Sequence, residues 1–298
     1  MGTPEFAVPS LQILVENGFN VVGVITVPDK PKGRGQKLTT SPVKDYAVAQ
    51  NIPVLQPTNL KSPEFLEELR SYNANLQIVV AFRMLPELVW DMPEIGTFNL
   101  HGSLLPQYRG AAPINWAIIN GEKETGVTTF FLKHEIDTGS IIFQEKESIN
   151  EDDNVGSVYG RLMAKGAGLV LKTVAAIQTG TYPQNEQDES VEIKHAPKIF
   201  KETCEIDWTK SPEEIYNFIR GLSPYPAAWT TIGEKVFKIF GSEKTELKKI
   251  KGAPGEYKTD NKTFLHIQTG GSPIAITELQ MQGKKRMDIE SFLRGAKL

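Results

Sequence analysis

Cysteine is nearly absent from this sequence, because Cys204 is the only one among 298 residues. A single cysteine cannot form an internal disulfide, and without an adjacent histidine it is more typical of packing than of nucleophilic catalysis. We therefore expect no redox centre and no thiolate metal site.

Long apolar runs are also lacking. The longest, such as residues 76–82, fall well short of the roughly 20 residues that cross a bilayer. The chain does not open with the pattern of a secretory signal peptide. We therefore predict a cytoplasmic protein that does not enter a membrane.

Excess positive charge is a third absence, since the formal net charge is -3. This balance argues against a protein that binds nucleic acid by charge alone. The distribution is uneven, however, because residues 201–298 carry 16 basic and 13 acidic side chains, whereas the preceding residues carry 17 and 23. An acidic N-terminal part and a mildly basic C-terminal part favour a catalytic domain joined to a module that contacts a polyanion. An ordinary solvated surface also produces a charge difference of this size.

The length is sufficient for two domains, each with its own core. In the front part, helical and strand-like patterns alternate, which indicates a Rossmann-like α/β domain with an open parallel sheet and helices on both faces. Helices are predicted over residues 6–18, 42–50, 63–71, 113–120 and 155–179. Strands are predicted over residues 20–27, around 54, and over 76–81, 97–100, 126–133 and 140–145.

We assign residues 1–180 to this domain, residues 181–203 to a polar linker with proline near each end, and residues 204–298 to a second domain. The second domain has one predicted helix, residues 212–221, and short strands over 229–232, 236–240, 263–268 and 274–280. Short strands with glycine and proline between them are typical of a small OB-like β-barrel, which binds nucleic acid or saccharide or serves as a structural cap.

The segment NLHGSLLPQYRGAAP, residues 99–113, carries the strongest chemical signal. Asn99 and His101 lie two residues apart at the carboxyl end of a predicted strand, so their side chains point the same way, at the sheet edge where ligands bind. An amide donor beside an imidazole suits a carbonyl that becomes a tetrahedral oxyanion. The alternative is a core histidine beside a turn asparagine.

Asp137 lies in HEIDTGSI, at a predicted turn between two strands. Thr138 and Gly139 allow a tight backbone course, so the carboxylate could face a cleft. An aspartic protease is excluded because such an enzyme needs two Asp-Thr-Gly triplets and the sequence has one. Taken alone, a turn aspartate that caps backbone amides is the better interpretation.

A basic loop, PDKPKGRGQKLTTSP, occupies residues 28–42. Its cations are Lys30, Lys32, Arg34 and Lys37, set among glycine and proline, which favours an exposed loop that holds a phosphate backbone. The glycines do not have the spacing of a phosphate-binding GxGxxG or Walker loop. A solvated surface loop is the alternative.

Taken together, these segments resemble the formyltransferases that use 10-formyltetrahydrofolate, and within that family the members that act on methionyl-tRNA. In order along the chain, the resemblance rests on MGTPEFAVPSL, PDKPKGRG, SPVK, NLHGSLLPQYRGAAPINWAI, GVTTFF, IDTG, IDW and SPYPAAW. It implies transfer of a formyl group from 10-formyltetrahydrofolate to the amino group of methionyl initiator tRNA, for translation initiation, by a monomer.

The resemblance also implies roles for individual residues. Asn99, His101 and Asp137 would be catalytic, the first two stabilising the oxyanion while Asp137 orients His101 and assists proton movement. The folate pocket would be lined by Ser103, Leu104, Leu105 and Pro106, and the tRNA acceptor stem would be bound by Lys32, Arg34 and Lys37.

The sequence departs from the family pattern at three places. Relatives have an apolar strand ahead of GTPEF, so we expect the sheet of this chain to lack that strand, and a final strand after FLRGAKL is expected to be shortened. Phe82 and Arg83 stand where many relatives have an aromatic residue followed by glycine beside the folate.

Two other functions remain open. A related enzyme could formylate an amino-sugar nucleotide or a purine precursor with the same catalytic residues, but such an acceptor has no use for the basic loop or the SPYPAAW domain. A noncatalytic RNA-binding protein on an old enzyme fold is the other alternative, against which the retention of Asn99, His101 and Asp137 counts.

Overall fold

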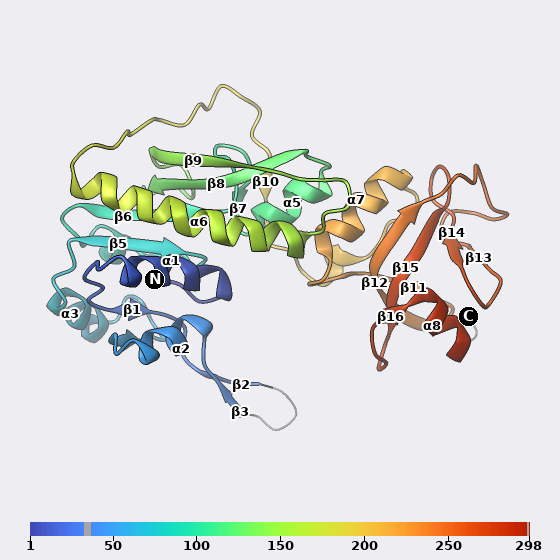
Figure 1. Cartoon of the computed structure of the whole chain (residues 1–298), viewed down its shortest axis with the longest axis horizontal. Helices are drawn as coiled ribbons and strands as arrows, with labels where there is room; N and C mark the ends of the chain where they lie inside the picture. Colours follow the sequence, from blue (N-terminus) through green and yellow to red (C-terminus); the bar gives the residue numbers. More distant parts are fainter. Residues whose placement is uncertain (33–36, 297) are drawn as a thin grey trace. The chain divides into compact units, whose positions relative to one another are not determined.

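A computed structural model describes residues 1–32, 37–296 and 298. By their internal contacts the residues form two compact units, which are described separately (Figure 1). Unit 1 comprises residues 1–109, 126–147 and 160–195, and unit 2 comprises residues 110–125, 148–159 and 196–298.

The boundary between the units differs from the predicted one. Residues 181–195, which we assigned to a linker, belong to unit 1. Their polar composition has a structural cause, because the backbone of Asn185 exchanges two hydrogen bonds with Ile141 at a strand edge. A segment that packs by hydrogen bonds along an edge needs few apolar residues, and its sequence therefore resembles a linker.

The α/β architecture of unit 1 is confirmed. Strands β5 (Leu76–Val80) and β6 (Gly96–His101) pair in parallel, and β8 (Glu124–Phe131) pairs antiparallel with β6, giving the order β5-β6-β8-β9 with β9 at Ile141–Ser148. Strands β1 (Val24–Ile25) and β4 (Val54–Leu55) form a separate parallel pair. The antiparallel β8 was not predicted, because periodicity reports a strand but not its direction.

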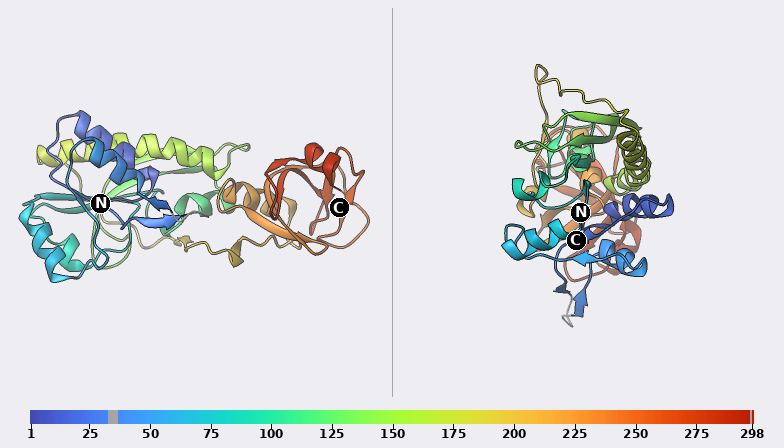
Figure 2. Two further views of the ribbon diagram at one scale, coloured as in Figure 1. Left: turned by 90° about the horizontal axis from the view of Figure 1, so that it is seen from below. Right: turned by 90° about the vertical axis from the view of Figure 1, so that its left-hand side faces the viewer.

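Helices cover both faces of the unit 1 strands (Figure 2). The helices are η1 (Glu5–Ala7), α1 (Val8–Glu16), α2 (Pro42–Ala49), α3 (Pro63–Ser71), α4 (Glu87–Trp90) and α6 (Val155–Gln178). Ser41 and Ser62 cap α2 and α3 by accepting hydrogen bonds from backbone N–H groups, with proline at the first helical position. Helix α6 packs on β6, where Gly166 faces Leu100, while α3 buries Phe65 in a cluster with β1 and β4.

The basic loop contains a short hairpin, formed by β2 (Lys30–Lys32) and β3 (Lys37–Thr39). At its base Lys44 donates to Asp29 at 2.5 Å and to Gln56 at 2.8 Å. The Lys44 ammonium and the Gln56 amide hold the pKa of the Asp29 carboxyl below its usual range. The base of the hairpin is thus fixed by the pairing of Lys44 with Asp29. Because this pairing neutralises Asp29, the positive charge of the hairpin lysines is not balanced by that carboxylate.

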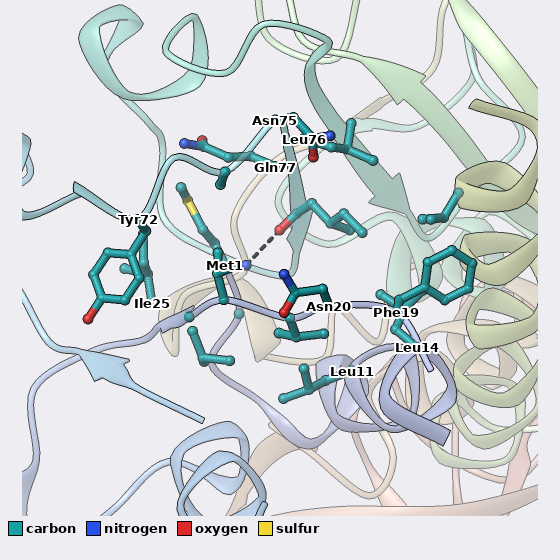
Figure 3. Close-up of a pocket in the computed structure, with 18 of the residues that line it drawn as sticks. Met1, Leu11, Leu14, Phe19, Asn20, Ile25, Tyr72, Asn75, Leu76 and Gln77 are labelled. Atoms are coloured by element: carbon teal, nitrogen blue, oxygen red, sulfur yellow. Dashed lines mark hydrogen bonds between the residues drawn. The ribbon is translucent and has the colours of Figure 1, made fainter. Parts of the chain in front are cut away.

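A cavity of about 510 Å³ separates β1 from β5 (Figure 3). Met1 and Gly2 lie at one end of it, where the Met1 amine donates to the Ile78 carbonyl at 2.6 Å, Val80 N–H donates to Met1, and Gly2 N–H donates to Ile25. These are the hydrogen bonds of a parallel strand between β1 and β5. Burial lowers the pKa of the Met1 amine from 8.0 to about 5.

Unit 2 is built on a curled antiparallel sheet in the order β11-β12-β15-β14-β13, with β16 also paired to β15. The strands are β11 (Ala228–Ile232), β12 (Lys235–Lys244), β13 (Tyr257–Thr259), β14 (Leu265–Ile267), β15 (Ile274–Met281) and β16 (Met287–Asp288). The register of β12 against β15 shifts on either side of Gly241, which bends the sheet.

Helices complete unit 2: α5 (Pro113–Ile119), η2 (Glu202–Cys204), α7 (Pro212–Leu222) and α8 (Ile289–Gly295). Helix α7 begins with a capping box between Ser211 and Glu214, and its apolar face enters a core with Phe237 and Phe292. Cys204 is buried in the same core, where burial raises the pKa of its thiol, in line with the packing role predicted for it. Two further short strands, β7 (Arg109–Gly110) and β10 (His195–Ala196), lie where the chain passes between the units.

None of the helices in the described part of the chain combines the length and the apolar character needed to cross a bilayer.

Candidate active site

Strand β6 ends at His101 and carries Asn99 on the same side, two residues earlier. Asn99 pairs with Val79 of β5 and Phe130 of β8, so strands on both sides fix its backbone. The His101 side chain is 6% exposed, and its ring stands edge-on to the Phe130 ring at a centroid distance of 6.4 Å. The two predicted residues therefore lie together at the carboxyl end of a central strand.

Both ring nitrogens of His101 face protein oxygens. Nε2 lies 2.9 Å from the Tyr108 carbonyl, and Nδ1 lies 3.8 Å from Oδ2 of Asp137. Because a carbonyl only accepts, the contact with Tyr108 places a proton on Nε2. The distance between Nδ1 and Oδ2 is that of an ion pair and exceeds that of a hydrogen bond, so the two nearly buried groups face each other without a direct hydrogen bond.

The turn between β8 and β9 aims Asp137 at His101. Asp137 adopts a left-handed backbone conformation, with φ of 57°, which aspartate tolerates better than most residues. Gly139 passes so close to β8 that a Cβ there would lie 1.6 Å from the Phe131 carbonyl oxygen. The sequence Asp-Thr-Gly therefore encodes the course of this turn, and the carboxylate of Asp137 is 10% exposed.

Asn99 has a buried side-chain oxygen, Oδ1, with no hydrogen-bond partner among the described residues. A buried acceptor without a donor costs about 1–3 kcal/mol, so it is retained where a ligand supplies the donor. Its place beside His101 makes the end of β6 a polar site within an apolar surround.

The residues proposed from the resemblance to line a folate pocket, 103–106, form a tightly held loop. The Ser103 hydroxyl is fully buried, and Thr128 on β8 bonds the backbone of both Ser103 and Leu105. The amide of Gln144 on β9 donates to the Leu105 carbonyl. Leu104 and Pro106 are the partly exposed members, so they provide the apolar surface that this loop offers to a ligand.

Phe82 and Arg83 follow β5. The Arg83 guanidinium donates to the carbonyls of Pro57 at 2.6 Å and Thr58 at 3.1 Å, and lies 5.7 Å from the centre of the Phe82 ring. Arg83 thus braces a neighbouring loop.

The predicted tRNA-binding residues lie in the β2–β3 hairpin. Lys32 and Lys37 are paired across its two strands. Arg34 lies outside the described residues.

A cavity of about 720 Å³ lies beside the Asp137 turn. It is lined by Trp90, Leu132, Lys133, His134, Glu135, Thr138, Glu186, Gln187 and Glu189. This volume is in the range of small-molecule sites, and Trp90 offers a flat apolar face. In the described part of the chain, no group of three or more His, Cys, Asp or Glu side chains is placed to hold a metal ion.

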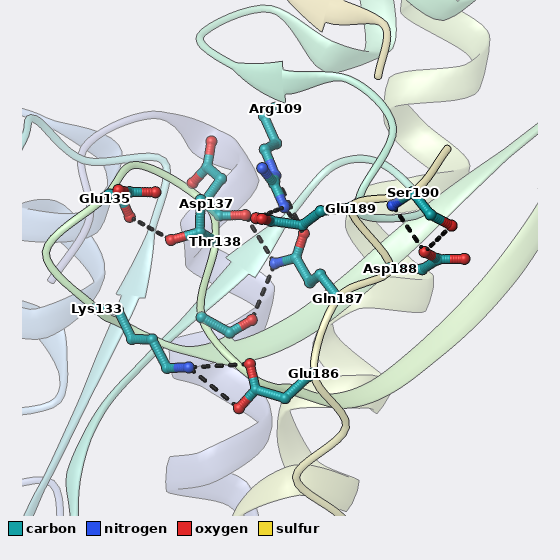
Figure 4. A network of polar contacts seen from close by, with 11 residues as sticks. Arg109, Lys133, Glu135, Asp137, Thr138, Glu186, Gln187, Asp188, Glu189 and Ser190 are labelled. Carbon is teal, nitrogen blue, oxygen red and sulfur yellow. Dashed lines mark hydrogen bonds and ion pairs between the residues drawn. The ribbon is translucent and has the colours of Figure 1, made fainter. Parts of the chain in front are cut away.

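Sequence reasoning missed three contributors to this site: Tyr108, Arg109 and Gln187. Tyr108 acts through its carbonyl, which no sequence pattern reveals. Arg109 and Gln187 are joined by hydrogen bonds of 2.8 and 3.1 Å across 78 positions of the chain (Figure 4). A single sequence gives no signal for such a pair.

Comparison with known proteins gives two domain matches. Residues 1–174 match the family described as formyl transferase, and residues 198–297 match the formyl transferase C-terminal domain.

Two relatives are similar over nearly the whole chain. A methionyl-tRNA formyltransferase of Bacteroides fragilis is 57% identical over 304 residues, which cover 99% of this chain and 93% of that protein. A methionyl-tRNA formyltransferase of Bacteroides thetaiotaomicron is 55% identical over 307 residues, covering 100% of this chain and 95% of the relative. Among solved structures, a sugar 3N-formyl transferase in the presence of dTDP and 5-N-formyl-THF has a TM-score of 0.69 at 22% identity, covering 95% of this chain and 97% of that one, which shows a shared fold.

Proposed function

The chain belongs to the formyl transferase family, and from this premise we propose that it transfers a formyl group from 10-formyltetrahydrofolate to the amino group of methionyl initiator tRNA. The observation that carries the proposal at the site is the buried pair of His101 and Asp137 beside the unpartnered oxygen of Asn99. The substrate assignment rests on the whole-length similarity to methionyl-tRNA formyltransferases.

The proposed chemistry is acyl transfer to an amine. The methionyl nitrogen attacks the formyl carbon, the new C–N bond forms, and the formyl oxygen becomes an oxyanion. The side-chain NH2 of Asn99 would donate to it, and so would the Nε2–H of His101 on leaving the Tyr108 carbonyl. The attacking nitrogen gives up a proton, the bond to the folate nitrogen breaks, and the folate nitrogen takes up a proton. His101 and Asp137 hold the proton that moves, since Nδ1 and the carboxylate face each other at 3.8 Å.

We place the donor against the loop of Ser103, Leu104, Leu105 and Pro106 and in the cavity beside the Asp137 turn. Leu104 and Pro106 supply apolar surface for a flat pterin, and Trp90 supplies an aromatic face on the other side of that turn. The reaction as proposed uses no metal ion.

We assign residues 204–298 to an OB-like tRNA-binding domain and the β2–β3 hairpin to the acceptor stem. A curled antiparallel sheet with a bulged central strand supports the first assignment, and three cations within residues 32–37 support the second. The protein would act as a monomer in the cytoplasm.

The function is tested with purified protein, 10-formyltetrahydrofolate and methionyl initiator tRNA, by measuring formyl-methionine after deacylation. We expect product with this acceptor and none with the same tRNA lacking methionine. An amino-sugar nucleotide serves as a competing acceptor. Product from that acceptor alone would overturn the proposal in favour of a small-molecule formyltransferase.

Substituting Lys32, Arg34 and Lys37 by alanine is expected to raise the KM for tRNA and leave the KM for the folate unchanged. Each lost phosphate contact should reduce the slope of log affinity against log salt by about 1. A matched control is the triple alanine variant of Lys61, Arg70 and Lys172, which removes the same charge from exposed positions of unit 1 outside the hairpin. An unchanged salt slope in the hairpin variant would mean that the hairpin does not bind tRNA.

A further inference from the structure

One side chain, Gln187, joins the two sides of the His101–Asp137 pair. Its Nε2 donates to the backbone carbonyls of Asp137 at 2.8 Å and Gly139 at 2.9 Å. Its Oε1 accepts from Arg109, at 3.1 Å from Nε and 2.8 Å from the terminal nitrogen (Figure 4). Gln187 therefore bonds the turn that carries the carboxylate and also an arginine on the histidine side.

The amide of Gln187 is fully used by these contacts. It is 7% exposed, both N–H groups have carbonyl acceptors, and the oxygen has two donors. Such a buried and fully satisfied group has one stable orientation, because any rotation would leave polar atoms unpaired.

Arg109 directly follows Tyr108, whose carbonyl orients the His101 ring. The contacts thus close a ring of connections: His101 to Tyr108, along the chain to Arg109, through Gln187 to the Asp137 backbone, and from the Asp137 carboxylate back to His101. In this ring, Gln187 sets the position of the turn relative to the histidine.

The neighbours of Gln187 hold its own segment in place. Asn185 bonds the backbone of Ile141, and the Glu186 carboxylate accepts from Lys133 and Ser140. The Glu186 side chain is 75% exposed, so its ion pair with Lys133 is screened and weak. Gln187 is therefore the buried link by which this segment reaches the Asp137 turn.

We propose that Gln187 is a positioning residue that sets the geometry between Asp137 and His101 for formyl transfer. The proposal rests on the proposed function. Gln187 touches no reacting atom and acts through the two carbonyls of the turn, because displacing that turn by a fraction of an ångström changes the separation of carboxylate and imidazole.

The test compares Gln187→Glu with Gln107→Glu. The glutamate at 187 keeps an acceptor for Arg109 but cannot donate to Asp137 or Gly139. Gln107 also bonds the 181–195 segment, through the Glu192 carbonyl and Lys194 N–H, but contacts neither residue of the turn, so it undergoes the same chemical change in the same region.

For Gln187→Glu we expect a loss in kcat of about 10- to 100-fold with the KM for tRNA little changed, since a misplacement of about 1 Å in catalytic geometry costs about that much. We expect hydrogen exchange to quicken at residues 133–140 and not in β5 or β6. For Gln107→Glu, kcat should remain within about 3-fold of the original.

Equal losses of kcat in the two variants, or a Gln187→Glu protein with normal kcat and normal exchange at the turn, would overturn the proposal. If the unaltered chain fails to formylate methionyl-tRNA, the proposed function fails, and the exchange measurement alone decides whether Gln187 positions the turn.

Discussion

Replacing Asp137 by asparagine is expected to lower kcat/KM for formyl transfer by about 1000-fold or more, within the range of a lost acid–base group. Asparagine tolerates the left-handed backbone of residue 137 and preserves the shape of the turn. It removes the negative charge 3.8 Å from Nδ1 of His101, so the imidazole loses the carboxylate that faces it. The affinity for tRNA should be unaffected, because the carboxylate is 10% exposed and lies inside the site.

The measurement is steady-state transfer with both substrates varied, together with tRNA binding in the absence of folate. Asp188→Asn is the matched control, since it removes one carboxylate from the same neighbourhood, where Asp188 bonds only to Ser190 among the contacts shown in Figure 4. If tRNA affinity or thermal stability falls as far as activity does in Asp137→Asn, the residue is structural and the acid–base assignment is wrong.

Helices that begin with Ser-Pro were predicted almost to the residue. Each of these helices starts with a serine whose side-chain oxygen caps the helix and a proline whose φ angle is already fixed, at residues 41–42, 62–63 and 211–212. Both signals lie within four residues of the chain. Helix α8 is capped by Asp288, which accepts from Ser291 N–H, but it has no proline at its first position and was missed. Helix α5 is equally short, at seven residues, but Pro113 marks its start.

Sheet topology was less accessible from the sequence. The position of β8 was predicted, yet its antiparallel direction depends on which neighbour it meets, and this is decided by packing of residues far apart in the chain. The β2–β3 hairpin lies within a segment we interpreted as loop, since glycine, proline and lysine conceal the strand signal of only three residues on each side.

The residues proposed for the candidate site stand out in short segments of the sequence. Asn99 and His101 share one strand, and Asp137 sits in a turn with its own sequence signature, but it was the family resemblance that favoured catalytic roles over structural ones. The parts that hold them together were not predictable, because Gln187 reaches Asp137 over 50 positions and Arg109 over 78. The sequence shows which residue types are available for catalysis, whereas the distances between them depend on contacts that form only on folding.

In a chain that begins at Met1, stability is expected to depend on pH through the Met1 amine. Burial lowers the pKa of this amine from 8.0 to about 5, so between these values the unfolded chain binds a proton that the folded chain does not. The free energy of unfolding should therefore rise with pH across this window, by at most about 4 kcal/mol at about 1.4 kcal/mol per pH unit. The residue as a whole is partly exposed, which is why this figure is an upper limit.

Two altered chains separate the charge from the cavity. Acetylating Met1 removes the charge and leaves most of the 510 Å³ cavity open, whereas extending the chain ahead of Met1 by about four apolar, β-branched residues removes the charge and supplies a strand between β1 and β5. Urea unfolding is measured from pH 5 to pH 8 for all three chains. Burial and Lys258 also lower the pKa of His266, but this group is common to the three chains and cancels in the comparison.

Both altered chains should lose the pH dependence of stability that is due to the Met1 amine. The extended chain should be the more stable of the two at every pH, because its added residues pair with the edges of β1 and β5 and fill apolar space. An acetylated chain with unchanged pH dependence would mean that the amine is hydrated in solution. An extended chain no more stable than the acetylated one would mean that the cavity closes by relaxation of β1 toward β5 and does not accept a strand.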